Sequence, residues 1–133
     1  MKENVMKKWV KALRSGKFKQ GQGTLKQYDR KGNAQHCCLG VLCELYNKDM
    51  KKNKKKMLPE KVCDNDSDFS HGYSRFGGKK EDLPKEVKDW AGMSSSLGNF
   101  DDPFSQPCLA DLNDTGQKFK TIADIIEKNY ENL

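Results

Sequence analysis

The sequence predicts a single α+β domain over residues 1–133, with amphipathic helices at both ends, a buried central helix and a small antiparallel sheet. The length of 133 residues suits one hydrophobic core. Apolar residues recur at helical spacing in separate segments, and shorter apolar runs between them are bounded by turn residues. Aromatic residues make up 9% of the chain, which together with this periodicity argues against a disordered protein.

Each end of the chain carries the pattern of an amphipathic helix. The first pattern consists of Val5, Met6, Trp9, Val10 and Leu13. Gly16 is a suitable stop, so we expect this helix to end near Ser15. The last pattern consists of Phe119, Ile122, Ala123, Ile126 and Tyr130, and a short helical turn near Leu109 and Leu112 precedes it. Both patterns indicate helices that pack one face on the core.

The elements between these helices are predicted from shorter patterns. A β-hairpin is expected at residues 24–28 and 34–37, joined by the turn sequence DRKGN. The segment CCLGVLCELY is apolar nearly all round, which predicts a helix buried at the centre of the domain with Glu44 as its only charged side chain. Further strands are expected near residues 58–63 and 71–76. A helix is then expected to begin at Pro84 and stop at Gly92.

The positive charge is confined to the first part of the chain. The net charge is +6, but residues 1–56 carry 16 lysines and arginines against four acids, whereas the remainder carries nine against 15. Residues 48–56 are rich in lysine and are predicted to form a solvated loop, with an anion-attracting patch as the alternative. Surfaces that bind nucleic acid usually add arginine and aromatic residues, so we do not expect nucleic acid as the main partner.

The cysteines and the hydropathy indicate a cytoplasmic protein with no membrane partner. Five cysteines form an odd set without the regular spacing of a secreted disulfide scaffold, which indicates reduced thiols. No segment has the roughly 20 consecutive apolar residues of a membrane span, and the N-terminus lacks the apolar region of a signal peptide.

Three residue patterns could form a chemical site, but the sequence favours a structural role for each of them. The cysteines and histidines lack the paired spacing of a zinc site. Cys37 lies at a predicted strand–helix junction, where a helix N-terminus favours a thiolate, but no orienting third residue is evident. Asp64, Asp66 and Asp68 begin like a calcium loop, but Arg75 stands where its bidentate glutamate is needed. We therefore expect no catalytic residues, metal or cofactor.

The glycine-rich stretch of residues 16–24 is the most suggestive binding feature. Backbone N–H groups without side chains can hold an anion, and basic residues flank them. The alternative is a flexible connection between the first helix and the hairpin. The candidate ligand-binding residues are Arg14, Lys17, Phe18, Lys19, Gln20, Gln22, Thr24, Asn113 and Asp114.

Four segments together resemble a known group of proteins. They are WVKALRSGKFKQGQGTL, CCLGVLCELY, LPKEVKDWAGM and CLADLNDTGQKFKTIADIIE. Their combination resembles a group of short, mostly uncharacterised proteins encoded by tailed phages and prophages. This chain departs from the group's pattern at Lys118, where serine or threonine is usual, so the cap of the last helix is expected to be lost.

The resemblance implies a phage accessory protein that acts in the cytoplasm of a bacterial host. We expect a non-enzymatic counter-defence binder, a sponge that sequesters an anionic nucleotide-type ligand, and a homo-oligomer is compatible with this role. One alternative is an inhibitor that binds a host protein through its basic face. A second alternative is a cysteine-dependent or metal enzyme.

Overall fold

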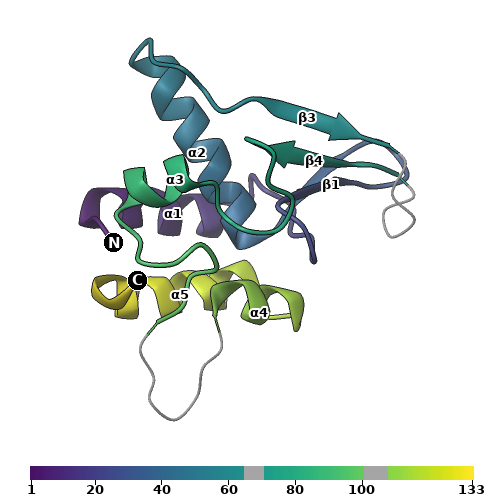
Figure 1. Cartoon of the computed structure of the whole chain (residues 1–133). Helices are drawn as coiled ribbons and strands as arrows, with labels where there is room; N and C mark the ends of the chain where they lie inside the picture. Colours follow the sequence, from purple (N-terminus) through teal and green to yellow (C-terminus); the bar gives the residue numbers. More distant parts are fainter. Residues whose placement is uncertain (65–70, 101–107) are drawn as a thin grey trace.

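A computed structural model describes residues 1–64, 71–100 and 108–133 and confirms the α+β class (Figure 1). The helices are α1 (Glu3–Arg14), α2 (Cys38–Lys52), α3 (Lys85–Ala91), α4 (Leu109–Asp114) and α5 (Phe119–Asn129), followed by the 3₁₀ turn η1 (Tyr130–Asn132). The strands are β1 (Lys26–Tyr28), β2 (Ala34–His36), β3 (Glu60–Cys63) and β4 (Tyr73–Phe76). The sheet lies on one side of α2, and α1, α4 and α5 lie on the other (Figure 1).

Helix α2 is the centre of the core, as its apolar sequence predicts. Leu39, Val41 and Leu42 are fully buried on it. Helix α1 packs against both α2 and α5 through its predicted apolar face. Trp9 of α1 is also fully buried, and its indole N–H donates to the carbonyl of Cys38 at 2.9 Å, so its polar atom is satisfied inside the core.

The four strands form one antiparallel sheet in the order β2-β1-β4-β3. The predicted hairpin is β1 and β2, with Tyr28 opposite Ala34. Asp29 closes the turn between them, since its carboxylate accepts from the backbone N–H groups of Asn33 and Lys31, each at 2.9 Å. These hydrogen bonds lower the pKa of Asp29. The turn is therefore held by its own side chain, as the sequence DRKGN predicts.

Strand register places polar residues on the sheet face that meets α2. Lys26 of β1 is opposite His36 of β2 on one side and Ser74 of β4 on the other. Residues that are opposite each other point to the same face of a sheet, so these three side chains share a face. Lys26 and His36 each approach Glu44 of α2, which identifies this as the α2-facing side.

Helix α2 continues further than predicted. Residues 48–52 of the expected lysine-rich loop form its last turns, and only residues 53–56 lie beyond it. Met50 is buried and attaches this end of the helix to the core. Lysine is a good helix former, and Lys51 and Lys52 lie at the C-terminus, where the helix dipole favours positive charge. The prediction of a loop at residues 48–52 was therefore wrong.

The remaining helix ends are close to their predicted positions. Helix α3 begins at Lys85 with Pro84 as its N-cap, one residue later than predicted, and Gly92 ends it with a φ of 69°. Helix α5 begins after Lys118, whose side chain makes no capping hydrogen bond, as the sequence predicted.

Candidate functional site

The glycine-rich stretch of residues 16–24, the Gly-rich loop, is fixed against helix α4 by Asn113. The Asn113 side chain is fully buried. Its amide donates to the carbonyl of Gly21 at 2.8 Å, and its oxygen accepts from the backbone N–H of Cys38 at 3.2 Å and from Gln20 Nε2 at 2.9 Å. One buried amide thus joins the loop, α4 and the start of α2.

Gln20 supplies the cap that Lys118 does not. Its Oε1 accepts from the backbone N–H of Phe119 at 3.0 Å, and its Nε2 also donates to the carbonyl of Gln117 at 2.7 Å. The first N–H groups of a helix need such acceptors. A residue almost 100 positions away in the sequence therefore caps α5.

Two further side chains attach the end of the Gly-rich loop. Asp114 accepts from the backbone N–H of Gly23 at 2.8 Å. Thr24 is buried, and its hydroxyl donates to the carbonyl of Lys80 at 2.8 Å. The structure therefore brings Gln20, Asn113 and Asp114 together with the loop, and their polar groups make hydrogen bonds within the protein.

The other candidate ligand residues do not converge on this contact. Arg14 forms ion pairs with Asp124 at 2.6 Å and Glu127 at 3.2 Å on α5, and both raise its pKa. Lys17 and Gln22 are exposed. The remaining two turn toward the hairpin: Lys19 lies 3.8 Å from Asp29, and the ring of Phe18 meets His36 edge-on at 5.2 Å between centroids. A ligand site in the loop stays a prediction.

A groove between α2 and the segment that leads into β3 is a second candidate site. Its volume is about 820 Å³. The groove is lined by Glu44, Asn47, Lys48, Lys51, Lys56, Met57, Leu58, Pro59 and Glu60. Asn47 fixes its width, because its side chain accepts from the backbone N–H of Leu58 at 2.8 Å and donates to the carbonyl of Leu58 at 3.3 Å. The walls are therefore joined before any ligand binds.

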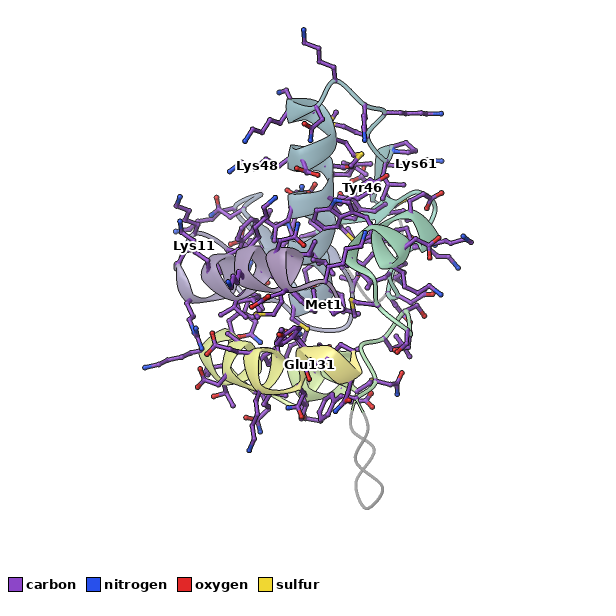
Figure 2. All side chains as sticks on the ribbon, turned by 90° about the vertical axis from the view of Figure 1, so that its left-hand side faces the viewer. Met1, Lys11, Tyr46, Lys48, Lys61 and Glu131 are labelled. Carbon is purple, nitrogen blue, oxygen red and sulfur yellow. The ribbon has the colours of Figure 1, made fainter. Side chains whose placement is uncertain are left out.

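Charges of both signs line this α2–β3 groove. Lys48 and Lys51 lie on successive turns of α2, and Lys56 comes from the opposite wall. Figure 2 shows Lys48 extending from the upper part of the molecule, far from Glu131 at the other end. Met57 is 45% exposed and adds apolar surface. The groove can thus contact an anionic group and an apolar ring at the same time.

The acidic part of the groove is connected to a polar cluster beneath it. Lys26 Nζ lies 3.0 Å from Glu60 Oε2 and 3.9 Å from Glu44 Oε1. Burial favours the neutral form of Glu44, but contacts with His36 and Lys26 outweigh it and lower the pKa of Glu44. Burial likewise lowers the pKa of Lys26, yet Glu60 and Glu44 raise it above its ordinary value. Glu44 and Lys26 are therefore both charged at neutral pH.

Sequence reasoning did not select the groove residues as a site. Two signals were present: the lysine-rich residues 48–56, for which an anion-attracting patch was the alternative, and Glu44, the only charged side chain in an otherwise apolar helix pattern. Glu60 gave no comparable signal, since it reaches the cluster only through the pairing of β3 with β4.

Cys37 has a structural role. It is the N-cap of α2, where its sulfur accepts from the backbone N–H of Gly40 at 3.4 Å. Burial raises the pKa of the Cys37 thiol to about 11, despite the helix N-terminus beside it. The thiol is protonated at neutral pH, which argues against the nucleophilic role considered from the sequence.

Most of the acidic segment that begins like a calcium loop lies outside the described residues. Asp66 and Asp68 fall among residues 65–70, which are not described. In the three described ranges, no group of three or more His, Cys, Asp or Glu residues is arranged to hold a metal ion. Helices in those ranges are all too short or too polar to cross a membrane.

Comparison with known proteins identifies the family. No curated protein and no solved structure matches the chain significantly. The profile of a family described as Domain of unknown function (DUF8296) matches residues 1–130, nearly the whole chain. The chain therefore belongs to the DUF8296 family.

Proposed function

We propose that the protein binds an anionic nucleotide-type ligand without transforming it, and that the ligand occupies the α2–β3 groove. The observation that carries this proposal is the line of Lys48 and Lys51 on one wall, with Lys56 opposite and the carboxylate of Glu44 at the floor. Lysines bind phosphate, apolar surface packs on a base, and a carboxylate accepts hydrogen bonds from base or sugar.

The resemblance to phage-encoded proteins supports a biological setting for such binding. A phage accessory protein that sequesters a nucleotide signal in the host cytoplasm would blunt a defence response without any catalysis. The protonated thiol of Cys37 supports this view over a cysteine-dependent enzyme.

The groove is preferred to the Gly-rich loop because its polar groups are less occupied. Gln20, Asn113 and Asp114 already make hydrogen bonds inside the protein. In the groove, Lys51 and Lys56 make no ion pair within the described residues. A ligand phosphate would therefore replace water around these ammonium groups and would not have to break a protein contact.

Isothermal titration calorimetry with linear and cyclic nucleotides and ADP-ribose tests this proposal, and mass spectrometry of the recovered ligand tests whether it is unchanged. We expect the double variant Lys48→Ala/Lys51→Ala to bind at least about 100-fold more weakly, because each of the two lost charge-assisted contacts is worth about 1.5 kcal/mol or more. Lys120→Ala/Lys128→Ala is the matched control, since both lysines are exposed on α5.

A third variant separates the two candidate sites. Lys17→Ala/Lys19→Ala removes two positive charges from the Gly-rich loop and should leave nucleotide affinity unchanged. If this variant loses affinity while Lys48→Ala/Lys51→Ala does not, the site is in the loop. If the parent protein binds no member of the panel, nucleotide binding is refuted.

An inhibitor of a host protein is the second candidate, and the basic face of α1 favours it. Lys7 and Lys11 are exposed on this helix, and Lys11 lies on the same side of the molecule as Lys48 (Figure 2). Such a surface suits an acidic protein partner. This candidate would be established instead if the protein binds no nucleotide and captures one host protein in a stoichiometric complex that survives high salt.

A further inference from the structure

We propose that Glu44 makes the α2–β3 groove select a nucleotide whose base presents two adjacent hydrogen-bond donors, as guanine does, over an adenine nucleotide. This inference rests on the proposed function and names the ligand class of the same groove. It is carried by the difference between the two carboxylates at the floor, by the buried histidine beside one of them, and by the spacing of charges along α2.

Glu60 is already occupied by protein donors. Its Oε2 accepts from the hydroxyl of Ser74 at 2.8 Å and from Lys26 Nζ at 3.0 Å, and its Oε1 lies 3.2 Å from the same ammonium group. The Tyr28 hydroxyl also lies 3.4 Å from Oε2. Ser74 is fully buried, so this side of the cluster is closed to solvent. Glu60 therefore serves to hold Lys26 in position.

Glu44 has open acceptor positions. Its Oε1 lies 3.9 Å from Lys26 Nζ and its Oε2 lies 3.8 Å from His36 Nε2, and both separations exceed hydrogen-bond length. Its side chain is 29% exposed and lines the groove. An ionised carboxylate can accept about four hydrogen bonds and donate none. Glu44 can thus accept a pair of hydrogen bonds from a ligand while Lys26 remains beside it.

The buried imidazole of His36 lies beside Glu44, behind the residues that line the groove. Its side chain is only 6% exposed, and neither ring nitrogen has a hydrogen-bond partner. Buried polar groups are almost always satisfied, so an unpartnered imidazole next to an open carboxylate is unusual. A shift of Glu44 Oε2 from its present 3.8 Å to hydrogen-bond distance from His36 Nε2 would satisfy that nitrogen and hold the carboxylate in place. His36 is therefore a positioning residue for the carboxylate.

The spacing along α2 fits a nucleotide placed lengthwise. Glu44, Lys48 and Lys51 follow one another on consecutive turns, and the rise of about 1.5 Å per residue puts Lys51 about 10 Å beyond Glu44. A base edge on Glu44 would leave the 5′-phosphate near the two lysines. Guanine then presents N1–H and the N2 amino group to the two carboxylate oxygens. Adenine presents its amino group beside the lone pair of N1, and the carboxylate repels that lone pair.

Calorimetric titration of the full chain with GMP, IMP and AMP tests this inference. IMP keeps the N1–H donor of guanine but lacks the N2 amino group. We expect GMP to bind at least tenfold more tightly than AMP, and IMP to fall between them. The Glu44→Gln variant should bind GMP about tenfold more weakly and lose the preference, because its amide offers one acceptor and one donor. Glu44→Asp, which keeps a carboxylate, should retain the order of affinities.

The control and the opposite outcomes separate this inference from the proposed function. Glu131→Gln removes the same charge at the far end of the molecule and should change neither affinity (Figure 2). Equal affinity of the parent protein for the three nucleotides would overturn the inference and leave nucleotide binding in place. If the Glu44→Gln variant keeps the preference for GMP, Glu44 is not the residue that selects the base. Absence of binding to all three by a protein that binds another nucleotide of the panel would overturn the inference alone, whereas absence of binding to the whole panel would overturn the proposed function.

Discussion

Replacing Asn113 with alanine should destabilise the protein by about 3 kcal/mol. The side chain is fully buried and satisfies two backbone groups, the N–H of Cys38 at 3.2 Å and the carbonyl of Gly21 at 2.8 Å. Leaving a buried polar group unsatisfied costs about 1–3 kcal/mol. Gln20 also loses an acceptor, but its Nε2 keeps the carbonyl of Gln117. The two backbone groups left without a partner, at about 1.5 kcal/mol each, give the total of about 3 kcal/mol.

Urea denaturation followed by circular dichroism measures this loss as a lower transition midpoint at an unchanged slope. For a chain of this length, the thermal midpoint should fall by roughly 10–15 °C. Gln117→Ala is the control, because Gln117 is exposed and contributes only its backbone carbonyl to these contacts. A loss below about 1 kcal/mol in Asn113→Ala would refute the reasoning that this amide holds the Gly-rich loop against α4.

Three further predictions concern the same framework. Gly40→Ala should prevent stable folding at 37 °C, as judged by circular dichroism, because a Cβ there would lie 1.7 Å from the carbonyl oxygen of Leu25; a native-like thermal midpoint would contradict this. Gln20→Ala should cost about 1 kcal/mol in urea denaturation by removing the cap from Phe119, and no loss would mean that water replaces the cap. Burial raises the pKa of Cys37 from 9.0 to about 11, so the contribution of the protonated thiol to stability is fully present below pH 9, and about 3 kcal/mol is lost as the pH rises to 11. Cys37→Ser does not titrate in this range, so its urea midpoint should fall less; parallel falls would contradict the assignment.

The helices were predictable because their signals are local. The periodic apolar positions of α1 and α5 all lie within about a dozen residues, and the structure buries that predicted face in each helix except at Tyr130, which lies in η1 and is only half-buried. The turn at Asp29 is equally local, since its side chain bonds backbone groups two and four residues ahead. The exception was the end of α2, where a run of lysines resembles a loop in composition although Met50 still faces the core.

The candidate site was less predictable because its contacts join distant parts of the chain. Asn113 was selected for its ability to hydrogen-bond a ligand, and that same ability holds Gly21, 92 residues away. Likewise, Lys26 meets Glu60 across 34 residues only because β4 lies between their strands. No periodicity or motif in the sequence encodes such pairings. Residue types therefore indicated that these side chains form polar contacts, but not whether the partner is a ligand or the protein itself.

Under the proposed function, one end of α2 contributes to stability and the other end to ligand binding. At its N-terminal end, Cys37 caps the helix, Gly40 allows the close approach of Leu25, and the N–H of Cys38 receives Asn113. These contacts are buried and mutually satisfied, so a ligand could enter only by breaking them. At the other end, Lys48 and Lys51 are solvated on a wall that Asn47 already fixes in place. A ligand there would gain charge contacts without disturbing the core, and this difference supports the proposal of a site in the groove over one in the Gly-rich loop.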